Sequence, residues 1–183
     1  MTIHLHLDFE TASELDLTLV GLHTYAEHPS TKIIVAAWAT VEGIVHAWKW
    51  GNDPSGLSML TGLSRNNFSG VEIHAHNAEF EWVIWNKVFT RQFKTLQIMD
   101  LKQMNCSMAR ALNYGLPASL DDLGVALNLL TDQRKIAGRK VMLKMSRPRN
   151  ADITKGPVTW WHEDTNGQPL ADLTEYCKRD VVC

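Results

Sequence analysis

The sequence lacks the features that mark membrane, secreted and disulfide-stabilised proteins. No apolar run approaches the roughly 18 residues that a membrane-spanning helix needs. The first ten residues, MTIHLHLDFE, contain acids and no basic region, which argues against a signal peptide. The three cysteines have no C-x-x-C spacing, so they favour neither a disulfide framework nor a zinc knuckle. We therefore expect a soluble, cytoplasmic protein with no membrane partner.

A global excess of basic residues is also lacking, because the formal net charge is −2 at pH 7. This does not exclude a nucleic-acid partner, since local patches matter more than the total charge. The length of 183 residues suits one domain with a sizeable core. We expect residues 1–183 to form a single domain, whose last helix would be truncated if the chain is excised from a longer protein.

The patterning predicts an α/β domain. Strands are expected at residues 3–9, 31–40, 44–50, 71–75 and 95–99, and the second and third of these are expected to form an antiparallel hairpin. Helices are expected at residues 78–89, 101–113, 119–130 and 170–183. Residues 131–168 are rich in charge, glycine and proline and are expected to be irregular. This order predicts a mixed sheet, an antiparallel hairpin plus parallel strands, flanked by helices.

Asp8 and Glu10 are the first candidate site residues. They lie two apart at the end of the first predicted strand, so both carboxylates face the same side. Like charges placed together are costly unless a cation neutralises them. Carboxylate oxygens suit hard cations such as Mg²⁺ or Mn²⁺. The alternative is an exposed acidic strand end that binds nothing.

Two further segments place acids near helices. In HNAEFE, Asn77 is expected to cap a helix that carries Glu81 in its first turns. In YCKRD, Tyr176 and Asp180 are four apart and share one helix face. Taken alone, each segment also fits an ordinary capped helix or a core tyrosine beside a solvated aspartate.

In this order, the three segments resemble the motifs of the DEDD superfamily of 3′→5′ exonucleases, which have a ribonuclease H-like fold. LDFET, HNAEFE and YCKRDV look like the first, second and third motifs, in the subclass with Tyr four residues before Asp. The resemblance is closest to the proofreading exonuclease region of phage family A DNA polymerases. SMARALNYGLPASLDDLGVALNL and GRKVMLKMSRPR are similar to that group's linker. Glu81 departs from this pattern, because many members of the superfamily have Asp at this position.

The resemblance implies hydrolysis of DNA from its 3′ end by a two-metal mechanism with Mg²⁺ or Mn²⁺. Asp8 would bridge both ions. Glu10 and Asp180 would hold the ion that binds the attacking water, and Glu81 would help place the other ion, directly or through water. Tyr176 would orient the nucleophile, because a phenol with a pKa of about 10 is a poor base at neutral pH. The products would be nucleoside 5′-monophosphates.

Substrate contacts are expected beside these acids and in the basic part of the irregular segment. The predicted nucleic-acid-binding residues are Phe9, Thr11, Asn77, Phe80, Lys144, Arg147 and Arg149. Basic side chains would contact phosphates without reading sequence, although a solvated basic loop fits them too. The two phenylalanines could stack on bases, and a core role for Phe80 fits equally well.

The expected partners are single-stranded DNA or a frayed 3′ end, and a polymerase domain or subunit; the setting would be phage DNA replication in the host cytoplasm. Two alternatives stay open. One is an RNA-processing exonuclease of the same superfamily, which a contact to the 2′-hydroxyl would distinguish. The other is a non-catalytic nucleic-acid-binding module of the same fold, which would not need a carboxylate cluster.

Overall fold

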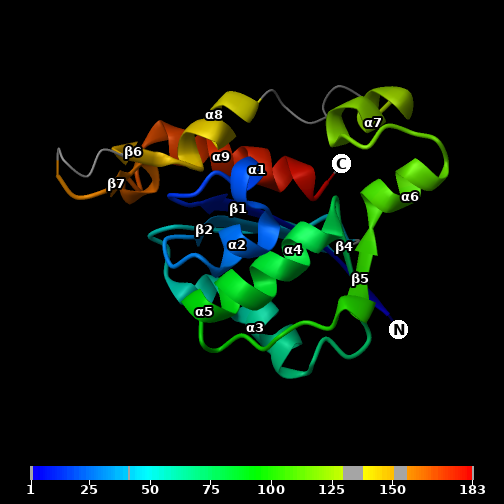
Figure 1. The fold of residues 1–183 in the computed structure, drawn as a ribbon. Coiled ribbons are helices and arrows are strands. Elements are labelled where there is room, and N and C mark those ends of the chain that lie inside the picture. Colours follow the sequence, from blue (N-terminus) through cyan, green and yellow to red (C-terminus); the bar gives the residue numbers. More distant parts are fainter. Residues whose placement is uncertain (1, 41, 130–137, 151–155, 183) are drawn as a thin grey trace.

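A mixed five-stranded sheet forms the centre of the computed structural model, which describes residues 2–40, 42–129, 138–150 and 156–182. The strand order is β3-β2-β1-β4-β5 (Figure 1). The strands are β1 (Ile3–Ala12), β2 (Lys32–Thr40), β3 (Val45–Lys49), β4 (Val71–Ala75) and β5 (Met104–Cys106). The pairs β1–β2 and β2–β3 are antiparallel, and the pairs β1–β4 and β4–β5 are parallel. The predicted fold class and the predicted hairpin are confirmed.

Helices cover both faces of this sheet (Figure 1). The α-helices and the π-helical turn η2 are, in chain order, α1 (Leu17–Val20), α2 (Leu22–Glu27), α3 (Ser58–Arg65), α4 (Ala78–Ile84), η2 (Trp85–Phe89), α5 (Thr90–Gln92), α6 (Ser107–Asn113), α7 (Leu120–Ala126), α8 (Arg139–Met145) and α9 (Gln168–Asp180). Short 3₁₀ turns and a small hairpin complete the described chain: η1 (Pro54–Leu57), η3 (Leu101–Gln103), β6 (Pro148–Asn150), β7 (Thr159–Trp160) and η6 (Trp161–Glu163). Among the described residues, no helix has the length and apolar character needed to cross a bilayer.

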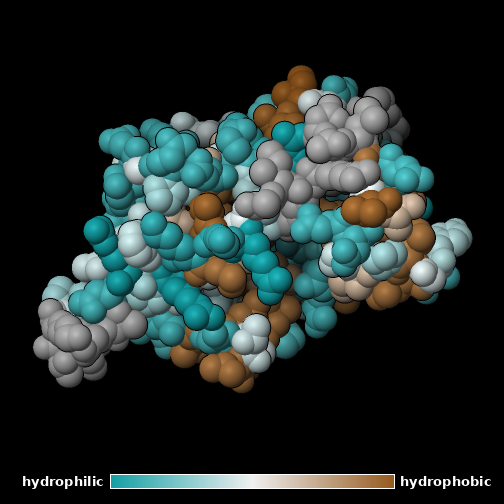
Figure 2. Space-filling model, turned by 90° about the horizontal axis from the view of Figure 1, so that it is seen from above, coloured by the Kyte–Doolittle hydropathy of each residue, from teal (hydrophilic) through white to brown (hydrophobic). Residues whose placement is uncertain are grey.

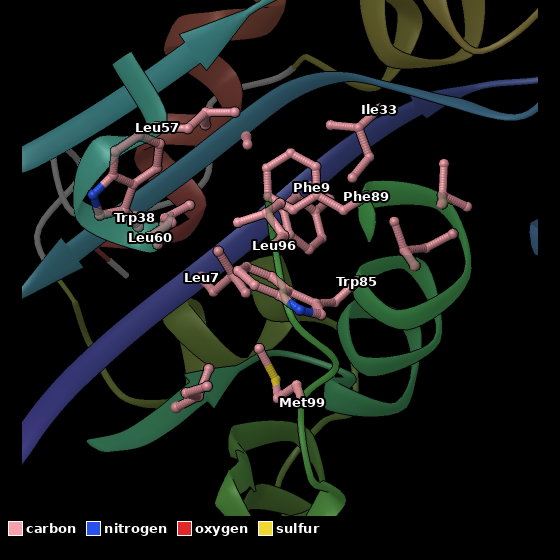
Figure 3. Packing of buried hydrophobic residues seen from close by; sticks show 14 of the residues in the cluster. Leu7, Phe9, Ile33, Trp38, Leu57, Leu60, Trp85, Phe89, Leu96 and Met99 are labelled. Atoms are coloured by element: carbon pink, nitrogen blue, oxygen red, sulfur yellow. The ribbon is translucent and has the colours of Figure 1, made fainter. Parts of the chain in front are cut away.

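The larger core lies between one face of the sheet and the helices α2, α3, α4 and η2. Phe9 of β1 packs edge-on against Phe89, with 5.2 Å between ring centroids, and Trp85 packs against Phe89 in the same way (Figure 3). Burying a large apolar side chain contributes about 1.5–3 kcal/mol. Odd-numbered residues of β1 therefore anchor the strand, and its even-numbered residues face the opposite side of the sheet.

The second core lies between the opposite face and the helices α8 and α9. Two of the three alanines of β2, Ala37 and Ala39, face this core and leave room for α9 to pack closely. Nearly all of β2 is buried, because helices cover the central strands on both faces. Seen from the α8 and α9 side, hydrophilic side chains cover much of the surface, with hydrophobic patches between them (Figure 2). This second layer carries the C-terminal end of α9 to β1.

Several predicted elements need correction. Residues 95–99 were expected to be a strand, but they form an irregular stretch in which Leu96 and Met99 are buried. Side chains bond to its backbone: the indole nitrogens of Trp82 and Trp85 donate to the carbonyls of Met99 and Gln97, at 2.9 and 2.8 Å. Two apolar side chains of the run are therefore buried, and its carbonyls accept hydrogen bonds from side chains and not from a neighbouring strand.

Three further predictions differ from the structure in extent. The helix expected at 101–113 is replaced by η3, β5 and α6, and the helix expected at 119–130 ends at Ala126. Ser119 caps that helix as predicted, because its hydroxyl accepts a hydrogen bond from the Asp122 amide at 3.1 Å. The segment 131–168 contains α8 and the β6–β7 hairpin, although residues 130–137 and 151–155 lie outside the described chain.

Candidate active site

A cavity of about 470 Å³ opens where β1 ends and where the chain leaves β4 for α4. Its walls come from β1, α1, α2, α4, α8 and α9, so segments from the beginning, middle and end of the sequence meet there. In α/β sheets, ligands bind beyond the carboxyl ends of parallel strands. The parallel pair β1–β4 places this cavity at such an end.

Three carboxylates meet at this cavity. Asp8 and Glu10 lie two apart on β1 and share one face of the sheet, and Asp180 is the last residue of α9, which packs on that face. Each side chain offers an oxygen, and these oxygens lie within 4.8 Å of one another. Glu10 is only 9% exposed, whereas Asp8 and Asp180 are half-buried. Such a grouping of oxygen ligands is the donor set that hard divalent cations prefer.

Glu81 adds a fourth carboxylate from α4. It is 3% exposed, and its Oε2 has no hydrogen-bond partner among the described residues. Burial, and secondarily the negative charges of Asp8 and Glu10, raise the pKa of Glu81 well above its ordinary value. Glu79, two residues earlier, is exposed and faces elsewhere. A buried carboxylate beside other carboxylates needs either a proton or a cation, so these residues fit a bound metal.

Tyr176 lies four residues before Asp180 on α9 and borders the cavity, although its side chain is only 6% exposed. Gly138, the residue before α8, packs against its ring. A Cβ added to Gly138 would overlap Cδ2 of Tyr176 and would lie 2.8 Å from Cγ and Cε2. The absence of a side chain at Gly138 therefore lets the start of α8 close over the ring.

Cys177 is a neighbour of the site that sequence reasoning missed. Its buried thiol donates a hydrogen bond to the backbone carbonyl of Asp8 at 3.5 Å, which ties α9 to β1. Burial, and then the charges of Asp8 and Glu10, raise the pKa of Cys177 well above its ordinary value. The thiol thus stays neutral. No signal in the sequence separates this cysteine from an incidental one.

Asp16, Tyr25 and Arg139 also border the cavity and were not predicted. The hydroxyls of Tyr25 and Thr11 lie 2.9 Å apart, and burial raises the pKa of Tyr25 to about 12, so it remains protonated. Asp16 precedes α1 and accepts a hydrogen bond from the Thr18 amide at 3.0 Å. All three lie within or next to helices too short to show a periodic pattern, which explains why they were not predicted.

The predicted nucleic-acid-binding residues on β1 and beside α4 differ in how exposed they are. Phe80 is half-buried and borders the cavity, and Asn77 is exposed at its edge. Asn77 does not cap α4 with its side chain as expected; it adopts a left-handed conformation, with φ 64°. Thr11 is buried against Tyr25. Phe9 borders the cavity but is only 4% exposed, and its ring packs against Phe89 in the core.

The predicted basic contacts gather around α8 and the β6–β7 hairpin. Arg147 borders the cavity and donates to Asp16 at 2.7 Å. Lys144 and Arg149 both lie over the ring of Trp161, at 4.0 and 4.9 Å from its centroid. The structure therefore brings one of these cations to the cavity itself and holds the other two on an aromatic platform.

Comparison with known proteins links this chain to a phage DNA polymerase. No protein-family model matches the sequence. Over 178 residues, or 97% of the chain, the sequence is 30% identical to the DNA polymerase of Bacillus phage SP02. The chain spans about a quarter of that polymerase, 26% of its length. The match is compatible with a polymerase-associated exonuclease region, and together with the acid cluster it fits a role in nucleic-acid processing.

Proposed function

We propose that this chain is a metal-dependent 3′→5′ exonuclease that removes nucleotides from the 3′ end of DNA. The observation that carries the proposal is the meeting of Asp8, Glu10 and Asp180, from β1 and α9, with oxygens within 4.8 Å, beside the buried Glu81. Such a cluster of negative charges repels phosphates, so it would weaken the binding of nucleic acid in a module without bound metal ions. The similarity to a phage DNA polymerase supports DNA as the substrate and proofreading as the setting.

Asp8, Glu10 and Asp180 would hold Mg²⁺ or Mn²⁺, with Glu81 contributing directly or through water. When two such ions are bound, they lower the pKa of a water molecule and stabilise charge on the phosphate. Glu81 would then be ionised, because a cation offsets the burial and the neighbouring charges that raise its pKa. A bound cation would therefore stabilise the folded chain relative to the metal-free folded chain, in which the buried carboxylate is costly.

The remaining cavity residues would position the substrate. The hydroxyl of Tyr176 orients the attacking water by a hydrogen bond, and Phe80 stacks on or wedges the terminal base. Arg147 leaves Asp16 to contact a phosphate, an exchange that costs little because the Arg147 side chain is 61% exposed. Lys144 and Arg149 extend this surface along the strand without reading its sequence.

The test is digestion of single-stranded DNA labelled at its 5′ end, with Mg²⁺ or Mn²⁺. We expect a ladder that shortens from the 3′ end and disappears with chelator or in Asp8→Ala. Glu79→Ala is the matched control, because Glu79 is an exposed acid of α4, and it should digest like the unmodified chain. If the DNA binds to the chain but is not degraded, the nuclease proposal is wrong and the chain is a non-catalytic binding module. A parallel RNA substrate degraded faster than DNA would favour the RNA-processing alternative.

A further inference from the structure

The first half of β1 carries a second group of ligand-bearing side chains. His4 pairs with Glu72 of β4 across the parallel strands, and His6 pairs with His74. Because residues two apart on a strand share a face, these four side chains project from one face of the sheet. It is the face opposite the core side chains Leu5 and Leu7, which belong to the larger core.

Three of these side chains converge. Nδ1 of His4 lies 3.1 Å from Nε2 of His74, and Oε2 of Glu72 lies 3.5 Å and 3.9 Å from these two nitrogens. In a tetrahedral zinc site with bonds of about 2.1 Å, neighbouring ligand atoms are separated by about 3.4 Å. The three observed separations bracket that value. The ligand atoms are thus already spaced as three corners of a tetrahedron.

The ring of His74 is held in place for this arrangement. His6 stacks on it, with centroids 5.1 Å apart and 20° between the planes. The side chains of His4, Glu72 and His74 keep 40%, 50% and 21% exposure, so solvent reaches the open fourth corner. Each neutral imidazole can carry its proton on the other ring nitrogen and present a lone pair to an ion.

We propose that His4, Glu72 and His74 form a binding site for one Zn²⁺ ion, with water as the fourth ligand. Two imidazoles and one carboxylate are a donor set that suits zinc, whereas the all-oxygen set of Asp8, Glu10 and Asp180 suits Mg²⁺ or Mn²⁺. An ion held there joins β1 to β4 near their N-terminal ends. This inference is independent of the proposed nuclease function, because it uses none of the residues assigned to it.

The test is titration with Co²⁺, whose visible absorption reports tetrahedral coordination, followed by displacement with Zn²⁺. The unmodified chain with excess Mg²⁺ and the double variant Asp8→Ala/Asp180→Ala are titrated side by side, so that binding at the acid cluster is removed. We expect one tetrahedral Co²⁺ per chain in both, and a melting temperature that rises with Zn²⁺ concentration.

Loss of a residue that hydrogen-bonds to a metal ligand typically lowers metal affinity by about 10- to 100-fold. Removing one of the ligands itself should weaken Co²⁺ binding by more than that. His74→Ala and Glu72→Gln are the test variants, and Glu72 is exposed enough for its variant to keep the fold. His23→Ala, an exposed histidine of α2, is the matched control and should bind like the unmodified chain. Absence of a tetrahedral spectrum, or the same affinity in Glu72→Gln, would overturn the proposal.

Discussion

The two halves of β1 differ in what they require from a ligand. At one end, Glu10 is buried beside Asp8 and Asp180, and the buried Glu81 feels the charges of Asp8 and Glu10. At the other end, His4 and its neighbours on β4, Glu72 and His74, are partly exposed to solvent. Buried like charges are costly without a cation, whereas exposed imidazoles are not. Under the proposed function, the acid end would therefore need a cation to offset its charges, whereas the histidine end would only gain stability from one.

A large effect, second only to the loss of a carboxylate from the acid cluster, is expected from removing the hydroxyl of Tyr176, which affects the acid end alone. Tyr176→Phe should lower the single-turnover excision rate by about 100-fold, because a misplaced nucleophile costs that much. Mn²⁺ binding, measured by calorimetry, should be unchanged, as should Zn²⁺ binding at the histidine end. Excision at the unmodified rate would remove Tyr176 from the mechanism.

A smaller effect of the same kind is expected at Gly138. In Gly138→Ala the new Cβ overlaps the ring of Tyr176, so either α8 or the ring must shift. We expect a loss of about 10-fold in excision rate, since small displacements of positioning groups are costly. Gly62→Ala is the matched control: its Cβ meets open space in α3, and it should raise stability by about 0.5–1 kcal/mol with full activity. Equal activity in both variants would exclude a positioning role for Gly138.

Glu81 should make the stability of the metal-free chain depend on pH. Its folded-state pKa lies above the ordinary value of 4.5, so the folded chain holds a proton that the unfolded chain releases. The free energy of unfolding therefore falls as the pH rises from 4.5 through the folded-state pKa. Glu81→Gln should flatten this decline and raise the melting temperature at neutral pH. Thermal melts from pH 4 to 8 without metal test this; an identical decline in the variant would contradict it.

The smallest effect is expected from the basic surface around Trp161. Lys144→Ala should weaken binding of single-stranded DNA a few-fold and reduce the salt dependence of the affinity by about one unit of slope. The control is Lys102→Ala, because Lys102 precedes β5 at the opposite end of the parallel strands. Fluorescence anisotropy of labelled single-stranded DNA, measured at several salt concentrations, gives the affinity and its salt dependence for both variants. Equal slopes for both variants would remove Lys144 from the substrate path.

Much of this arrangement could be predicted because it depends on simple periodicity. The alternation of β1 places Asp8 and Glu10 on one face, and the helical spacing of Tyr176 and Asp180 places both on one side of α9. The hairpin of β2 and β3 follows from two apolar runs and a short connection. These features are local, and each is set by residues within a few positions.

The rest depends on contacts that the sequence does not display. Helices α1, α2 and α8 are four to seven residues long, too short for a periodic pattern to indicate them. The apolar run at 95–99 resembles a strand, yet indole nitrogens take its backbone hydrogen bonds. The histidine cluster joins two strands separated by some 70 positions, and only the register of β1 with β4 brings its members together.

The most direct test of the central claim compares Asp180→Asn with His74→Ala in one excision assay with Mn²⁺. Asp180→Asn keeps the shape of the side chain and removes one charge from the acid cluster. We expect it to lower excision by at least about 10²–10³-fold, the scale of losing one electrostatic contact to a transition state. His74→Ala should excise at the unmodified rate. Full activity in Asp180→Asn would contradict a metal-dependent nuclease site built on these acids.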